Sequence, residues 1–189
     1  RAGDRVMTSV RKFIENELKL KVNENKSAVA SPMRRKFLGY SFYHTKGKYR
    51  LRVHAKSVKR LKENIREVTN RNVSMNFEAR VKKLIEKTRG WVNYFKLADM
   101  VSMLKEIDQW VRRRLRACIW KTWKHVRTRF DNLRKLGIGK PKAWEYANTR
   151  KGYWRISNSP ILATAITNDR LEKRGYISMS TMYKKVQLA

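Results

Sequence analysis

Three apolar stripes at helical spacing occupy the middle of the chain, between residues 58 and 118. The stripes share a repeat of three or four residues, which is the period of one face of an α-helix. They are Val58, Leu61, Ile65 and Val68, then Phe77, Val81, Leu84, Trp91 and Phe95, and finally Leu104, Ile107, Val111, Leu115 and Cys118. Ser57 is expected to cap the first helix. Because short polar loops join the stripes, the sequence predicts a three-helix bundle.

The segments on either side of this bundle read differently. Val6, Val10 and Phe13 predict a helix over 4–18, and alternation predicts strands over 18–23, 36–43 and 49–53. TKGK at 45–48 is a turn between the last two strands, so a β-hairpin is expected. After the bundle, short helices are expected up to about 136–139, over 141–147 and within 161–175. The predicted fold class is α+β, mostly α.

The net charge limits the partners. Forty-seven Lys and Arg residues against fifteen Asp and Glu residues give +32, and the excess runs along the whole chain. Such a field predicts a polyanionic partner, and nucleic acid fits better than a membrane because no single basic amphipathic helix dominates. A hydrophobic content of 41% argues against global disorder. One cysteine excludes an internal disulfide and a cysteine-based zinc site.

The stretch DQWVRRRLRACIWKTWKHVRTR, 108–129, is dense in both cations and tryptophans. On a continuous helix of about 3.6 residues per turn, one face carries the third apolar stripe. The opposite face would carry Arg113, Arg116, Trp120, Trp123, Lys124 and Arg127. Two interpretations stay open: the tail of the chain covers the rings, or the rings contact a sugar or base beside phosphate-binding cations.

Six stretches in order resemble one family. They are LKLKVNENKS (18–27), FLGYSF (37–42), RGWVNYF (89–95), RRRLRACIWKTWK (112–124), LGI (136–138) and GYWRISNSP (152–160). Together they are similar to the C-terminal half of a group II intron-encoded reverse transcriptase, also called a maturase. The resemblance implies the end of a polymerase palm over 1–55, a three-helix thumb, or maturase X domain, over 56–127, and a small helical DNA-binding domain over 128–189. With one cysteine, the chain resembles members that lack the endonuclease module.

One feature of the family is absent. Members carry a Tyr-Ala-Asp-Asp motif on a palm hairpin, expected just upstream of Arg1, whose aspartates hold catalytic Mg²⁺ ions. The five aspartates of this chain are isolated from other carboxylates. The chain alone is therefore expected to bind no metal or other cofactor and to be inactive as a polymerase, whereas the missing aspartates would hold Mg²⁺.

The resemblance also assigns roles to residues. Lys26 matches a palm lysine with a possible accessory catalytic role, although it could simply close a turn. Phe37, Leu38, Gly39 and Tyr40 match a primer grip, or could pack palm on thumb. The nucleic-acid-binding candidates are Arg112, Arg113, Arg116, Trp120, Trp123, Lys124, Arg127 and Arg155. Any one of the thumb arginines could instead be solvated or paired with a glutamate, and Arg114 is expected to be structural.

The implied function is RNA-directed DNA synthesis, intron splicing and retrohoming, with intron RNA, an RNA template–DNA primer duplex and target DNA as partners. A cytoplasmic location, with action at the bacterial nucleoid, is expected, and no membrane. The alternative is a non-enzymatic RNA-binding maturase module. A generic basic structural protein, such as a ribosomal component, is a third hypothesis, which the ordered motifs disfavour.

Overall fold

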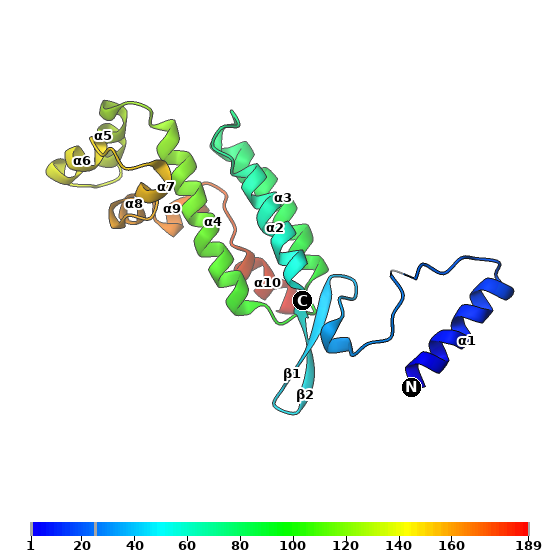
Figure 1. Ribbon diagram of the computed structural model, residues 1–189. Coiled ribbons are helices and arrows are strands. Elements are labelled where there is room, and N and C mark those ends of the chain that lie inside the picture. The colour runs from blue at the N-terminus through cyan, green and yellow to red at the C-terminus, as the bar shows by residue number, and fades with distance from the viewer. Residues whose placement is uncertain (1, 25, 189) are drawn as a thin grey trace. The chain divides into compact units, whose positions relative to one another are not determined.

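The computed structural model describes residues 2–24 and 26–188, and most of them are helical. The chain divides between His54 and Ala55 into two compact units. Among the described residues, the first holds one α-helix, a short 3₁₀ helix and a β-hairpin, and the second holds the other α-helices (Figure 1). The predicted class, α+β and mostly α, is therefore confirmed at this coarse level.

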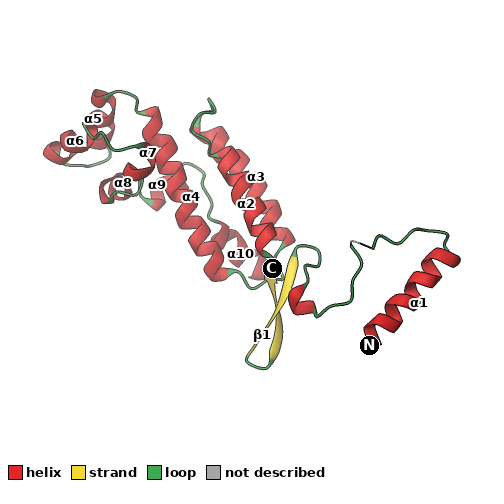
Figure 2. Ribbon diagram, in the orientation of Figure 1, coloured by secondary structure: helices red, strands yellow, loops and turns green. Residues whose placement is uncertain are grey.

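The first unit contains α1 (Ala2–Asn16), a short 3₁₀ helix η1 (Pro32–Arg34), β1 (Tyr40–Thr45) and β2 (Lys48–Val53). The two strands form the expected antiparallel hairpin, drawn in yellow in Figure 2, with Tyr40 opposite Val53 and Thr45 opposite Lys48. Lys46 and Gly47 turn the chain with φ of +47° and +72°. Positive φ at both central residues suits the twist of a two-residue hairpin loop, which explains the glycine there.

One strand prediction in this unit is wrong, and a second begins four residues too early. Residues 18–23 form no strand, because no partner strand lies beside them among the described residues, and an extended segment needs a partner to bond its backbone. Residues 36–39 also precede the sheet. Leu38 and Gly39 form a tight turn with φ of +49° and +86°, closed by a two-way backbone bridge between Phe37 and Tyr40.

The second unit begins with three long helices: α2 (Ala55–Val68), α3 (Phe77–Tyr94) and α4 (Val101–Thr122). Their apolar stripes form its core, and the central residues Leu61, Leu84, Leu104 and Leu115 are at most 1% exposed. The three predicted helices are thus confirmed. Ser57 is not the N-cap, since α2 begins at Ala55, directly after β2 ends. Asn76 caps α3 by accepting a hydrogen bond from the amide of Ala79.

Five shorter helices follow: α5 (Val126–Lys135), α6 (Lys140–Ala147), α7 (Tyr153–Ile156), α8 (Pro160–Ala165) and α9 (Asn168–Lys173). The expected helices near 136, over 141–147 and within 161–175 are present. The segment expected to be irregular contains the single turn of α7. The structure keeps residues 55–189 in one compact unit, and a domain boundary near residue 127 stays a prediction.

The last helix, α10 (Met179–Leu188), was not anticipated, and it packs against both α3 and α4 (Figure 1). A buried carboxylate on α4 holds its first turn. Asp108, 1% exposed, accepts hydrogen bonds from the amides of Met179 and Ser180 at 2.8 and 2.9 Å. It also accepts from the hydroxyls of Ser180 and Tyr176 at 2.6 and 3.2 Å. A carboxylate at a helix N-terminus satisfies amides that have no partner within the helix.

Candidate nucleic-acid interface

The polar face of α4 contacts the C-terminal segment of the chain. Arg113 donates to the carbonyl of Trp154 at 2.9 Å, and its guanidinium carbon lies 3.8 Å from the centre of that indole ring. Arg116 donates to the carbonyl of Ile166 at 2.9 Å and to the side chain of Asn168 at 3.1 Å. Burial lowers the pKa of Arg116, although a guanidinium remains charged in proteins. Arg113 and Arg116, which were both predicted to bind RNA, therefore hold the C-terminal segment, or tail, on α4 in this structure.

The two tryptophans of this region behave differently. Trp120 is 1% exposed and lies under Arg129, whose guanidinium carbon is 5.0 Å from the ring centre. Trp123 is half-buried and meets Trp120 edge-on, with ring centres 5.6 Å apart. Trp120 is thus an internal anchor, which favours the covering interpretation for that ring. Trp123 keeps part of its surface open.

The single-helix prediction for 108–129 is wrong beyond Thr122. The helix α4 ends there, and Trp123 leaves helical geometry with φ of −81° and ψ of 70°. Lys124 lies in the connection to α5, and Arg127 lies in α5 itself. Both are exposed, but they do not extend the face that carries Arg116.

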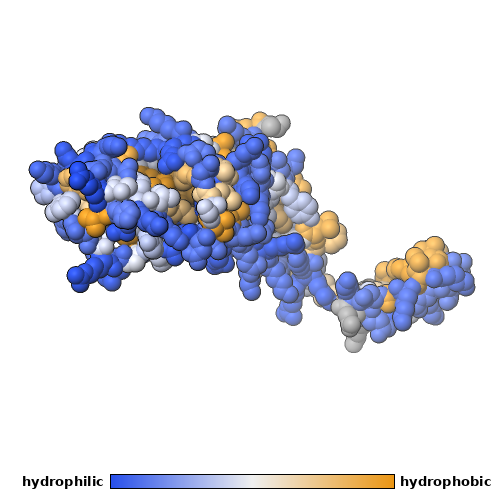
Figure 3. Space-filling view, turned by 90° about the horizontal axis from the view of Figure 1, so that it is seen from above, coloured by the Kyte–Doolittle hydropathy of each residue, from blue (hydrophilic) through white to orange (hydrophobic). Residues whose placement is uncertain are grey.

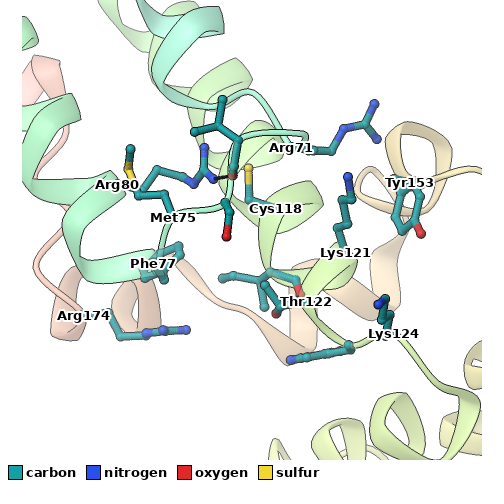
Figure 4. A pocket seen from close by; sticks show the side chains of 14 residues that line it. Arg71, Met75, Phe77, Arg80, Cys118, Lys121, Thr122, Lys124, Tyr153 and Arg174 are labelled. Atoms are coloured by element: carbon teal, nitrogen blue, oxygen red, sulfur yellow. Dashed lines mark hydrogen bonds between the residues drawn. The ribbon is translucent and has the colours of Figure 1, made fainter.

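A basic pocket lies where the end of α4 meets the loop between α2 and α3. Its volume is about 440 Å³. Figure 4 shows Lys121, Lys124 and Tyr153 at one side and Phe77 and Arg174 at the other. The cations that line it are Arg71, Arg80, Lys121, Lys124 and Arg174, and the rings are Phe77, Trp123 and Tyr153. Among the residues that the structure describes, no Asp or Glu lines this basic pocket.

Arg80 shapes the wall of the basic pocket rather than offering a free cation. It is 4% exposed and donates to three carbonyls of the loop, those of Val68, Asn70 and Val73, the last two at 2.9 Å. Arg114 supports the same loop by donating to the Thr69 hydroxyl and, at 3.4 Å, to its carbonyl, as a structural role requires. These contacts give a loop of polar residues one defined shape.

Cys118 lies at the floor of the basic pocket. It is buried, and its thiol donates to the carbonyl of Thr69 at 3.4 Å. Burial raises the pKa of the Cys118 thiol despite the surrounding cations Arg80 and Arg114. A protonated, enclosed thiol is unreactive, so the chemistry of the basic pocket is that of cations and rings.

Residues 58–137 match the model of the group II intron, maturase-specific domain. Over these residues the chain is similar to a group II intron maturase domain. The resemblance drawn from the sequence is thereby confirmed. No curated protein matches the chain in a comparison of sequences.

The basic pocket lies mainly within the matched residues 58–137. Of its lining residues, Tyr153 and Arg174 come from beyond the matched range. Tyr153 starts α7, and Arg174 directly follows α9. Sequence reasoning named Trp123 and Lys124 but missed Arg71, Lys121, Tyr153 and Arg174. The four positions share no sequence periodicity. The docking of the tail on α4 brings Tyr153 and Arg174 to the pocket that Arg71 and Lys121 line.

The other predicted site residues lie elsewhere. Arg112 is half-buried on α4 and Arg155 is exposed on α7. In the first unit, Lys26 is exposed, and Phe37 and Leu38 are about two-thirds exposed on their turn. Gly39 is buried, and its carbonyl accepts from the amide of His54 at 2.9 Å. Their proposed roles with a primer remain predictions.

Two searches of the described residues were negative. Within 2–24 and 26–188, no three His, Cys, Asp or Glu side chains gather where they could hold a metal ion. None of the helices described there has the length and apolarity needed to span a membrane.

Proposed function

We propose that the chain is the C-terminal part of a group II intron reverse transcriptase and maturase. The maturase domain implies that group II intron RNA is its partner. The observation that carries the proposal is the basic pocket, built mainly within that domain and lined by cations without a carboxylate among the described residues. In this proposal the pocket and the exposed cations near it grip intron RNA and so support splicing.

The charge of the chain supports electrostatic binding to RNA. A net charge of +32 attracts a polyanion at long range, and contacts to phosphates release bound counterions. Lys121 donates to the side chain of Asn72 at 3.0 Å, which leaves its charge uncancelled. Lys124 is exposed. These two lysines are therefore the first candidates for phosphate contacts.

Further partners follow from the family resemblance. We propose that the thumb lies along an RNA template–DNA primer duplex, that Phe37, Leu38, Gly39 and Tyr40 approach the primer end, and that the tail contacts target DNA during retrohoming. The turn at Phe37 and Leu38 supports this, because both side chains are about two-thirds exposed there. Lys26 keeps its possible accessory role.

The 189 residues contain no adjacent aspartates that could hold paired Mg²⁺ ions. We therefore expect no primer extension by this chain with Mg²⁺ and deoxynucleotides, and measurable extension would contradict that expectation. A second candidate is a maturase that binds RNA without polymerising. A gene that encodes a Tyr-Ala-Asp-Asp motif just upstream of Arg1 would favour the polymerase function.

The test of RNA binding is a salt titration with a group II intron transcript. Lys121→Ala combined with Lys124→Ala should lower the log–log salt slope by roughly 1.4, if each lysine contacts one phosphate of single-stranded RNA. The matched control removes the same charge from α10, where Lys184 and Lys185 are exposed and lie away from the basic pocket. Lys184→Ala with Lys185→Ala should leave most of the slope intact. If both double variants lower the salt slope equally, the lysines of the basic pocket contribute only through the general charge of the chain.

A further inference from the structure

We infer that the basic pocket takes one unstacked nucleotide of single-stranded RNA, holding its phosphate by Lys121 and Lys124 and its base by Tyr153 and Trp123. This inference rests on the proposed RNA-binding function. It adds recognition of a base. Binding to the phosphate backbone of a duplex requires neither a cavity nor aromatic rings.

The size and lining of the basic pocket suit a nucleotide. At about 440 Å³ it falls among cavities that enclose small organic ligands. Its lining includes the apolar residues Val73, Met75 and Ile119, while its cations come from several separate segments. A base is a flat, largely apolar ring and its phosphate is an anion, so one nucleotide matches both parts.

Two of the three rings are available for stacking. Phe77 is covered by Arg174, whose guanidinium carbon lies 4.0 Å from the ring centre. Tyr153 is 36% exposed, with Arg71 on one side at 5.4 Å. Trp123 is held edge-on against Trp120, which keeps its orientation while part of the ring stays open. Fixed aromatic faces beside cations are what sequence-tolerant single-strand binding uses.

The cations divide into engaged and available groups. Arg80 is bonded to loop carbonyls, and Arg174 pairs with Glu78 at 2.7 Å. Lys121, Lys124 and Arg71 have no carboxylate partner among the described residues, and Figure 4 shows both lysines on the same side as Tyr153. Phosphate and base sites are therefore adjacent, as the parts of one nucleotide are.

A paired base cannot use such a site. In a duplex each base is stacked between neighbours, and a cavity reaches it only after it leaves the stack. A loop, bulge or strand end of a folded RNA already presents such a base. The inference therefore predicts a preference for single strands that depends on the bases and not only on the phosphates.

The experiment compares three probes with the full chain at one salt concentration: a short single-stranded RNA, the same strand made abasic, and a duplex of equal length. The wild type should bind the ordinary strand roughly 5- to 150-fold more tightly than the abasic strand. Tyr153→Ala should reduce this ratio at least severalfold and leave duplex binding unchanged. Tyr153→Phe retains the ring and should retain the ratio.

Two controls guard against a folding defect. Tyr94→Ala removes an exposed tyrosine from α3, outside the basic pocket, and should keep the wild-type ratio. Trp123→Leu is a second ring variant, expected to act like Tyr153→Ala, so the test does not depend on one substitution. Thermal melting of each variant identifies any that is unfolded.

The outcomes separate this inference from the proposed function. If both ring variants keep the base preference while the lysine double variant weakens every probe, the basic pocket binds phosphates alone. RNA binding then stands and the nucleotide site is overturned. If neither the ring variants nor the lysine variant changes any probe, the basic pocket is not an RNA surface and both proposals fail.

Discussion

The helices α1 and α4 carry similar amphipathic patterns and have opposite fates. In α4, the apolar residues at positions 104, 107, 111 and 115 are at most 2% exposed. In α1 no residue is buried, and Val6, Val10 and Phe13 are 62%, 47% and 57% exposed. Figure 3 shows hydrophobic side chains gathered along one side of α1.

This contrast shows that an amphipathic pattern forms a helix but does not supply its partner. The stripe of α4 meets α10 and the loop after α2, whereas α1 keeps its stripe exposed within the described residues. Because apolar burial contributes about 25 cal/mol per Å², the stability of the chain should reside mainly in residues 55–189. The following substitutions test that contrast, from the largest expected effect to the smallest.

The sharpest test compares two aromatic residues. Trp120→Ala should destabilise the second unit by about 3–5 kcal/mol, because it removes a fully buried ring. Phe13→Ala on α1 should change stability by no more than about 0.5 kcal/mol. Chemical denaturation followed by circular dichroism measures both. Similar losses in the two variants would mean that α1 buries its stripe in solution.

The second test concerns the carboxylate under α10. Asp108→Ala should cost about 3 kcal/mol, since it leaves the buried donors of Tyr176, Met179 and Ser180 unpaired. The exposed Asp131→Ala is the matched control and should be nearly neutral. Hydrogen exchange should locate the loss in α10 first. Unchanged protection of α10 in Asp108→Ala would show that packing alone holds this helix.

The third test separates the neighbouring tryptophans. Trp123→Ala should cost about 1–2 kcal/mol, clearly less than Trp120→Ala, because its ring is only half-buried. It should clearly weaken binding of single-stranded RNA, and it should lower the melting temperature less than Trp120→Ala does. Thermal melting and a binding titration on the same preparation give both quantities. The reverse pattern would assign Trp123 to the core.

The smallest effect concerns the thiol of Cys118. Since burial raises its pKa, the folded state favours the protonated form. This contribution is complete below the pKa of an unfolded cysteine, about 8.5, and is lost as pH rises through the higher folded value. Alkylation by iodoacetamide near pH 8 should be roughly tenfold or more slower than in denaturant. Rapid labelling of the folded chain would show that the loop over Cys118 opens readily.

The sequence anticipated features that depend on neighbours along the chain. The stripes of α2, α3 and α4 and the Lys46–Gly47 turn follow from local spacing and from backbone preferences. The resemblance to maturases followed from short ordered motifs, and Arg114 was rightly expected to be structural. These features need no knowledge of which distant segments meet.

Tertiary structure decided the rest. The end of α4 at Thr122 removed Trp123, Lys124 and Arg127 from the predicted face, and residues 18–23 have no partner strand within the described part of the chain. The tail docks on α4 through Arg113 and Arg116, two of the residues expected to bind RNA. That docking also brings Tyr153 and Arg174 to Arg71 and Lys121. Charge and periodicity are properties of the chain, whereas which cations remain available depends on long-range packing that no local pattern encodes.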